Sequence, residues 1–319
     1  MAALTKPGEW TYGIQLPIQT LTRTLVDDWE DTATVDDLVA ITKAADANGY
    51  GFVGVCDHIA IPDNEYASRM TTTWYDTIST LSFLAAHTQN THLLSVVWIA
   101  AYRHPLQTAK AFGTLDHLSG GRAILGVGAG HVEAEFEALG VDFSTRGKRL
   151  DETLDAVRGA FADTYVSHEG DFFSYTDVGV APQPAQPELP IWIGGAGKAA
   201  WKRTGRIGDG YIPMGLPKEQ YPEAIGIMRE AAAAAGRPDD VPLDVGYMTP
   251  WGYILGDPPD GIGMHWLQGG VEGLAGDIRA ARELGCNTMH LKFRARDAQE
   301  YADSLLAFAE EVVPLVNEG

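Results

Sequence analysis

Residues 115–131, LDHLSGGRAILGVGAGH, decide the fold of this chain. The stretch predicts the end of a helix at Leu118-Ser119, a left-handed turn at Gly120-Gly121, a short strand over 122–125 and a loop with glycines at 126, 128 and 130. A glycine-rich loop at the C-terminal end of a buried strand is where α/β proteins place ligands. Taken alone, the same pattern equally fits an ordinary connection between a strand and a helix.

Strand-like and helix-like segments alternate along the rest of the chain. Apolar runs predict strands over residues 12–16, 52–56, 93–99, 122–125, 191–193, 210–212, 243–248 and 288–293, with amphipathic helical patterns between them. Eight strand–helix units in 319 residues predict an α/β fold, a closed (β/α)8 TIM barrel formed by residues 1–319 as a single domain. Two long insertions follow the C-terminal ends of strands, where barrels carry their active sites. The first consists of 126–148 with the excursion at 164–190, and the second is 249–273. A short hairpin is expected at 170–175.

Composition and charge exclude several classes of partner. The formal net charge of −20 argues against nucleic acids and anionic membranes. The sequence contains no uncharged apolar run of about 18 residues, so no membrane span is predicted. The first residues lack the apolar core of a signal peptide. Two lone cysteines, Cys56 and Cys286, favour a reducing cytoplasm over a disulfide scaffold. The net charge equally fits solubility or a salt-adapted proteome and carries no functional conclusion. The expected partner is a small-molecule substrate.

Four motifs follow one another over residues 49–213. They are GYGFVGVCDHI at 49–59, YRHPLQTAKAFGTLDHLSGGRAILGVGAG at 102–130, EFEALGVDFSTRGKRLDE at 135–152 and PIWIGGAGKAAWKRTGRIGDGYIP at 190–213. In this order they resemble the luciferase-like monooxygenase superfamily, in particular its coenzyme F420 (deazaflavin)-dependent oxidoreductases. The resemblance implies a (β/α)8 barrel with a flavin or deazaflavin across its C-terminal face. Beyond residue 213 it is only architectural.

Two histidines are the candidates for acid–base chemistry. His58 follows the second strand, so barrel geometry predicts that it faces the active site. A neutral imidazole can take a proton from an alcohol while hydride leaves the carbon. The resemblance implies this role for His58, and a histidine that only caps a loop is the structural alternative. His131 stands where some similar dehydrogenases carry a glutamate, and it is expected to donate a proton or bind substrate. His131 and Glu135 have the spacing of a metal pair, but without an evident third ligand no metal is predicted.

The resemblance also implies a set of cofactor contacts. At Ser95-Val96 it implies a non-proline cis peptide whose bulge supports the central ring, whereas the residues alone fit a plain core strand. The segment GGAGK at 194–198 opens a helix, and the amide groups of a helix N-terminus bind anions such as the cofactor's phosphate. Many ligand-free turns have similar glycines. The expected cofactor-binding residues are Asp57, Ser95, Val96, Gly128, Ala129, Gly130, Gly194, Gly195, Ala196, Gly197 and Lys198.

Several other residues have both a binding and a structural interpretation. Arg103 precedes a helix and either holds an anionic cofactor tail or pairs with acids. Asp209 and His290 are expected to be structural, with His290 inside the barrel. Basic residues at the end of the last strand either bind an acidic substrate or form a solvated cluster: Lys292, Arg294 and Arg296. Aromatic residues of the 249–273 insertion shape the substrate pocket or a dimer contact: Trp251, Tyr253, His265 and Trp266.

Three functions are compatible with these patterns. The first is an F420-dependent oxidoreductase, since a reduced deazaflavin transfers hydride and reacts poorly with oxygen. The second is an FMN-dependent monooxygenase on the same barrel, and the third is a non-catalytic flavin-binding protein. The Asp57-His58 pair and the GGAGK loop favour the first, and a storage protein needs no acid–base histidine. Because members of the family are often homodimers, a homodimer is expected.

Overall fold

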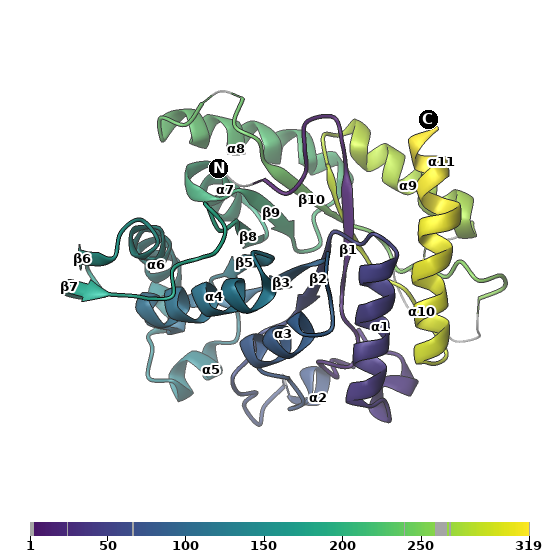
Figure 1. Cartoon of the computed structure of the whole chain (residues 1–319), viewed down its shortest axis with the longest axis horizontal. Helices are drawn as coiled ribbons and strands as arrows, with labels where there is room; N and C mark the ends of the chain where they lie inside the picture. Colours follow the sequence, from purple (N-terminus) through teal and green to yellow (C-terminus); the bar gives the residue numbers. More distant parts are fainter. Residues whose placement is uncertain are drawn as a thin grey trace.

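A closed parallel barrel forms the centre of the structure (Figure 1). The computed structural model describes residues 3–23, 25–65, 67–238, 240–258, 267 and 269–318. The hydrogen-bonded strand order is β3-β2-β1-β11-β10-β9-β8-β5-β4, and pairing of β3 with β5 closes the ring. Because β3 and β4 both pair with β5, they are two parts of one barrel position, which gives the eight positions expected. The strands are β1 (Thr11–Gln15), β2 (Phe52–Val55), β3 (His92–Ser95), β4 (Trp98–Ile99), β5 (Ala123–Gly128), β8 (Ile191–Gly195), β9 (Gly210–Pro213), β10 (Asp244–Met248) and β11 (Thr288–Leu291).

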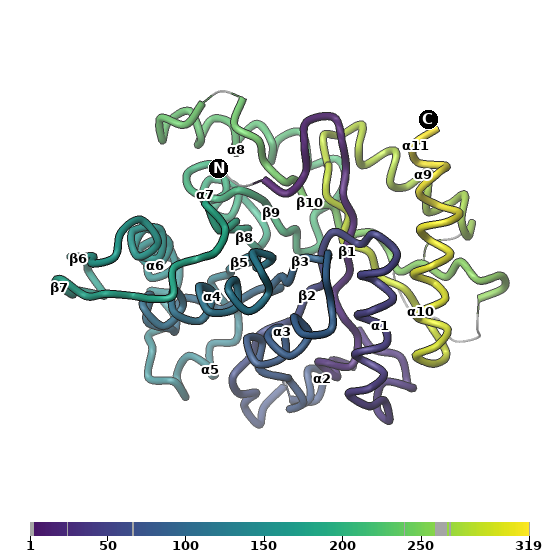
Figure 2. Tube along the Cα trace, in the orientation of Figure 1, coloured from purple at the N-terminus to yellow at the C-terminus, as the bar shows by residue number. Residues whose placement is uncertain are grey.

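Helices surround the barrel, and local sequence explains where they begin and end. Thr34 caps the first of them by accepting a hydrogen bond from the Asp37 amide, and Pro105 stands in the first turn of α4. Gly120 takes the left-handed conformation that ends α4, as predicted. The outer helices are α1 (Val35–Ala47), α3 (Thr77–Ala85), α4 (Pro105–Ser119), α6 (Arg146–Ala160), α7 (Lys198–Ile207), α8 (Tyr221–Ala234), α9 (Gly270–Glu283), α10 (Ala298–Ala307) and α11 (Val313–Asn317). In Figure 2, α1 lies beside α10, so the two ends of the chain complete the ring together.

Three smaller elements interrupt the strand–helix rhythm. The short helices α2 (Ala67–Met70) and α5 (Glu133–Ala138) follow β2 and β5 and lie on one side of the barrel (Figure 1). The antiparallel hairpin of β6 (Tyr165–Glu169) and β7 (Ser174–Gly179) projects from the barrel beside α6. The hairpin expected at 170–175 is therefore longer than predicted, since those residues include its turn.

The barrel interior is filled by large side chains from several strands. Phe52, Trp192 and His290 are buried against one another, with ring centroids 4.8 Å apart for Phe52 and His290. Burial lowers the pKa of His290 to about 3, so the ring stays neutral and serves as a filler, as predicted. Leu94, Ile124 and Ile212 complete this apolar layer.

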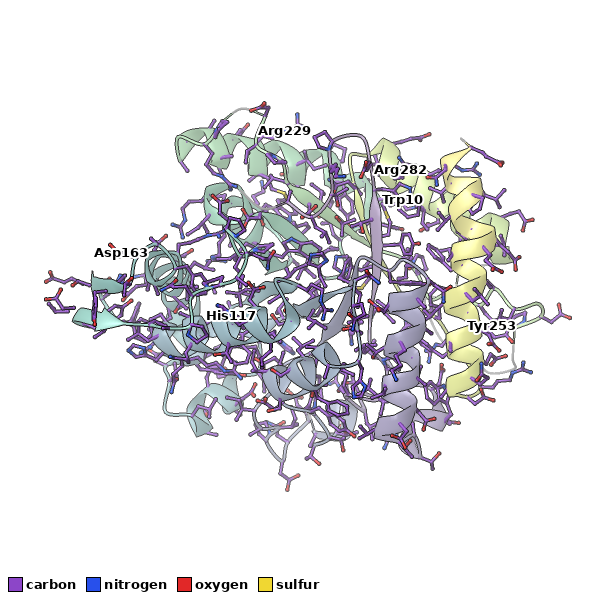
Figure 3. The ribbon with its side chains drawn as sticks, in the orientation of Figure 1. Trp10, His117, Asp163, Arg229, Tyr253 and Arg282 are labelled. Atoms are coloured by element: carbon purple, nitrogen blue, oxygen red, sulfur yellow. The ribbon has the colours of Figure 1, made fainter. Side chains whose placement is uncertain are left out.

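The N-terminal ends of the strands are covered by the first residues of the chain. The amides of Leu4 and Thr5 donate to the carboxylate of Asp244, which also accepts a hydrogen bond from Trp192 Nε1. Figure 3 shows Trp10 near Arg282, whose guanidinium carbon lies 5.6 Å from the indole centroid. The first residues of the chain therefore cover this end of the barrel, and the C-termini of the strands form the opposite end.

Neither cysteine forms a disulfide, and both thiols are buried. Burial raises the pKa of the Cys56 thiol to about 11 and that of Cys286 to about 12, so both remain protonated. Among the described residues no helix is long and apolar enough to cross a membrane.

Candidate active site

A bulge after β3 shapes the C-terminal mouth of the barrel. Val96 and Val97 interrupt the strand between β3 and β4, and both remain partly exposed. Glycines on three neighbouring strands make room for them: a Cβ on Gly54 would collide with Val96, and one on Gly128 or Gly194 with Val97. A Cβ on Gly126 would likewise collide with the Ser95 carbonyl oxygen. The glycine-rich stretch of β5 therefore accommodates the bulge, and Gly126 and Gly128 belong to the strand instead of the predicted loop.

The cis peptide lies one residue later than predicted, at Val96-Val97 instead of Ser95-Val96. Regular pairing continues through Ser95, which is paired with Val55, and the Val96 amide still donates to the Val55 carbonyl. The Ser95 hydroxyl donates to the Gly126 carbonyl and accepts from the Gly126 amide, at 2.8 and 3.0 Å. Ser95 is fully buried, and these two bonds tie the residue before the bulge to β5.

Asp57 is a structural anchor at the end of β2. Its carboxylate accepts hydrogen bonds from the two terminal guanidinium nitrogens of Arg103, from the Ile99 amide and from the Thr77 hydroxyl. Arg103 in turn stacks on the Trp98 ring, with its guanidinium carbon 3.5 Å from the centroid. The side chains of Asp57 and Arg103 are only 3% and 11% exposed. Of the two interpretations of Arg103, pairing with an acid is the one observed.

Replacement of Arg103 by methionine is expected to lower the free energy of unfolding by about 3–5 kcal/mol, because it leaves the buried Asp57 carboxylate without its counter-ion. Guanidinium denaturation of the purified variant measures this loss. The matched control is Arg206→Met, since the partly exposed Arg206 pairs with Asp155 and should cost about 1 kcal/mol or less. Equal losses in the two variants would show that the Asp57–Arg103 pair does not anchor the mouth.

His58 forms a dyad with Glu135. The imidazole Nδ1 lies 2.8 Å from Glu135 Oε2, and both side chains are nearly fully buried, at 6% and 1% exposure. The other carboxylate oxygen accepts hydrogen bonds from the amides of Ile59 and Ala60 and from the Tyr102 hydroxyl. Burial opposes ionisation of Glu135, but these bonds and the one from His58 outweigh it and lower the pKa of the carboxyl. Glu135 is therefore an acceptor that fixes the orientation of the His58 ring.

His131 completes this cluster. Its ring centroid lies 5.6 Å from that of His58, at 87° between the ring planes, so the structure brings the two predicted histidines together. Burial, followed by the neighbouring His58, lowers the pKa of His131, and this ring therefore stays neutral to lower pH than a free histidine. Trp74 also packs edge-on against His58, with 4.5 Å between centroids.

Sequence reasoning missed the role of Glu135. Its spacing from His131 was noted only as a metal-like pair, while its partner His58 lies 77 positions away in the chain. The signal present was a glutamate in the first turn of a helix just after a strand end. Within the described ranges, no group of three or more histidine, cysteine, aspartate or glutamate side chains could hold a metal ion.

The GGAGK segment lies where β8 turns into α7. β8 ends at Gly195, and Gly197 caps α7 with a φ of 79°. A Cβ on Gly197 would meet open space, and the first turn of α7 has no acidic residue. Lys198 Nζ lies 2.9 Å from Glu223 Oε1, with both side chains more than half exposed. Such a surface ion pair stabilises a protein by about 1 kcal/mol at most. Lys198 can therefore leave Glu223 and pair with a phosphate with little loss of free energy.

The predicted cofactor contacts at residues 128–130 lie at the end of β5 and just beyond it. Gly128, the last residue of β5, is buried against Val97, and Gly130, with a φ of 82°, lies against Phe136 and Ile99. Ala129 is partly buried against the same core. Asp209 is structural, as predicted, because its buried carboxylate pairs with Arg158 and accepts the Ile191 amide.

The basic residues after β11 separate into two kinds. Arg294 pairs with Asp27, and Arg296 pairs with Glu300 at the surface. Lys292 instead lies 4.9 Å from the centroid of the Trp251 ring. Tyr253 does not face the mouth: it is buried, its hydroxyl donates to Glu300 on α10, and Figure 3 shows it at that edge of the molecule. His265 and Trp266, also expected at the pocket, lie outside the described residues.

Comparisons with known proteins agree with this architecture. A family model described as luciferase-like monooxygenase matches residues 15–260. An uncharacterised protein of Mycobacterium tuberculosis is 28% identical over 280 residues, covering 84% of this chain and 94% of the relative. An F420-dependent glucose-6-phosphate dehydrogenase of Kineococcus radiotolerans is 36% identical over 163 residues, 49% of this chain and 48% of that protein.

Among solved structures, an F420-dependent secondary alcohol dehydrogenase in complex with an F420-acetone adduct superposes with a TM-score of 0.76. That alignment covers 97% of this chain and 99% of the other at 18% identity, which supports the fold alone. The family match over most of the chain carries the assignment beyond fold and makes the protein an oxidoreductase. The chain belongs to the luciferase-like monooxygenase family.

Proposed function

We propose that this protein is an F420-dependent oxidoreductase that moves hydride between the deazaflavin and a small organic substrate at the C-terminal mouth of the barrel. The observation that carries the proposal is the His58–Glu135 dyad, buried at the end of β2 with His131 beside it. The relative from Kineococcus, which is named for F420, supports the choice of cofactor.

The residues at the mouth fit such a cofactor. The partly exposed Val96 and Val97 offer an apolar surface for a planar ring, and Gly54, Gly128 and Gly194 leave the space that the bulge needs. The amides at the N-terminus of α7, with Gly195 and Gly197 before them, would hold a phosphate because no side chain obstructs the approach. When bound, the deazaflavin supplies a carbon that accepts or donates hydride.

The dyad supplies the proton chemistry that hydride transfer requires. Because ionised Glu135 can only accept, His58 carries a proton on Nδ1, and in the neutral ring the lone pair is then on Nε2. Nε2 can then accept the hydroxyl proton of an alcohol, and the Glu135 carboxylate stabilises the imidazolium that results. In the reverse direction the same atom donates a proton to a carbonyl oxygen. The buried surroundings keep water from competing for this proton.

Two alternatives make different demands on the site. An FMN-dependent monooxygenase is favoured by the family description itself, and it would use the same barrel mouth. A non-catalytic flavin-binding protein would have no use for a histidine held by a buried carboxylate, because storage of a cofactor needs no acid–base group.

A turnover assay tests the proposal. Purified protein is mixed with oxidised F420 and a panel of alcohols, or with reduced F420 and ketones, enones and imines, and the visible absorbance of the deazaflavin is followed. Substrate-dependent change of that absorbance is the expected result. Oxygen consumption with reduced FMN, together with no change of F420 on any substrate, would overturn the proposal in favour of the monooxygenase.

A further inference from the structure

Two loops at the C-terminal end of the barrel are joined by backbone hydrogen bonds. Residues 19–23, which follow β1, pair in antiparallel fashion with residues 69–75, which follow β2. Three bonds of 2.8 to 3.3 Å connect an amide to a carbonyl between the two segments: Tyr75 to Gln19, Leu21 to Thr73 and Arg23 to Arg69. We call this pair of segments the mouth ribbon. Because backbone groups of one loop are satisfied by the other, neither loop can move away alone without breaking these bonds.

Trp74 is the residue of the mouth ribbon that contacts the dyad. It forms an antiparallel bridge with Thr20, and its ring packs against that of His58 with 4.5 Å between centroids and 69° between planes. Thr77, three residues later at the start of α3, donates a hydrogen bond to the Cys56 carbonyl at 2.7 Å and so ties this segment to the end of β2. The backbone of the ribbon and the start of α3 therefore hold the indole against the imidazole.

This contact leaves little room at the reacting atom of His58. Nδ1 is engaged by Glu135, so a substrate can form a hydrogen bond with the ring only through Nε2. The His58 side chain is 6% exposed, and it lies beside the rings of Trp74 and His131. A substrate hydroxyl at hydrogen-bond distance from Nε2, about 2.8 Å, therefore lies close to the indole as well. Ile59, the next residue along the chain, is 51% exposed and adds apolar surface beside the dyad.

We propose that Trp74 limits the size of the group that a substrate places beside the His58 imidazole, and that this group is small and apolar. The proposal deepens the proposed function, on which it rests for the reaction, because it names the substrate class: an alcohol or carbonyl compound with small apolar substituents on the reacting carbon. Trp74 moves no proton, since its Nε1 donates to the Thr71 carbonyl. Its role is that of a specificity-determining wall, and a bulky substituent would have to displace an indole that the ribbon holds in place.

Chemical modification of His58 tests the size limit without a cofactor or a known substrate. Diethyl dicarbonate and the bulkier dibenzyl dicarbonate both acylate a neutral imidazole at the nitrogen with a lone pair, which in His58 is Nε2. Modification rates at His58 are measured by peptide mass spectrometry and divided by the rate at the exposed His117 of the same molecule. The comparison includes wild type, Trp74→Ala, Trp74→Phe and, as matched control, Trp10→Ala, which removes a partly exposed indole just before β1, at the opposite end of the barrel.

The expected pattern separates a size limit from general packing. Relative to His117, His58 of wild type should favour the smaller reagent by about 10-fold or more, and Trp74→Ala should lose most of that preference. Trp74→Phe should lie between the two, and Trp10→Ala should keep the wild-type preference. Thermal melting identifies the folded variants, and Trp74→Leu replaces Trp74→Ala if alanine does not fold. Equal reagent preferences in wild type and a folded Trp74→Ala or Trp74→Leu protein would overturn the proposal.

A second measurement ties the size limit to the reaction. The alcohols 2-propanol and 1-phenylethanol are compared as substrates with oxidised F420. Trp74→Ala should raise kcat/KM for 1-phenylethanol relative to 2-propanol by about 10-fold or more, mainly through KM, with Trp74→Phe in between. A merely structural role would lower kcat/KM for both alcohols alike, and an unchanged ratio would contradict the size limit. Loss of the reagent preference in Trp74→Ala, with no turnover of any compound, would retain the size limit and contradict the proposed function instead.

Discussion

His58→Ala is expected to lower kcat by about 10²–10⁴-fold, the usual contribution of a positioned general acid or base. The imidazole is the group whose Nε2 takes the substrate proton, and alanine leaves no side chain that can do so. Affinity for F420 should change by much less, because the ring is proposed to face the substrate side of the cofactor. Steady-state turnover and a cofactor titration on the same preparation separate the two effects.

Two matched variants make this result interpretable. His117→Ala removes an exposed histidine from the outer face of α4 and should leave turnover unchanged. His131→Ala tests the second histidine of the cluster, which would become the base if His58→Ala retained near wild-type turnover. If neither histidine matters, water supplies and removes the protons, and the dyad has no catalytic role.

Gly197→Asp is expected to abolish cofactor binding. A carboxylate would stand where the amides of α7 approach a phosphate, adding bulk and a like charge. The φ of 79° also makes any side chain unfavourable there, by about 1–3 kcal/mol. Titration of the folded variant with F420 measures the effect.

Controls separate charge from backbone strain at this position. Gly236→Asp, at the end of α8, has a φ of 73° and open space around its Cβ position, so it bears similar strain away from the mouth. Gly197→Lys bears the same strain with the opposite charge and should retain more affinity than Gly197→Asp. Unchanged affinity in a folded Gly197→Asp protein would place the phosphate elsewhere.

The barrel could be predicted because its strands are buried on both faces. Continuous apolar runs such as 93–99 and 191–193 leave no other place for their side chains. The rule that strand ends carry function singles out His58, which follows β2. The extent of β5 could not be predicted in the same way. Gly126 and Gly128 look like a loop by composition, and only the position of the bulge opposite them shows why a strand needs glycine there.

Local sequence pattern could not identify which residues the predicted site residues contact. Asp57 meets Arg103 across 46 positions and His58 meets Glu135 across 77, and a single sequence carries no record of such distances. Local pattern therefore predicts a cofactor contact for Asp57, whose described hydrogen bonds are all within the protein, and predicts no site role for Glu135. The same holds for the basic residues after β11, since Arg294 pairs with Asp27 and Arg296 with Glu300, contacts that their spacing alone does not reveal.

The most direct test of the account is a competitive titration of the purified protein with F420 and FMN, followed by fluorescence or calorimetry. The bulge at Val96-Val97 and the α7 N-terminus are proposed to hold the deazaflavin, so F420 should bind more tightly than FMN and should displace it. Variant Gly197→Asp should lose that binding, which ties the signal to the proposed site. Micromolar binding of FMN with no detectable binding of F420 would contradict the account.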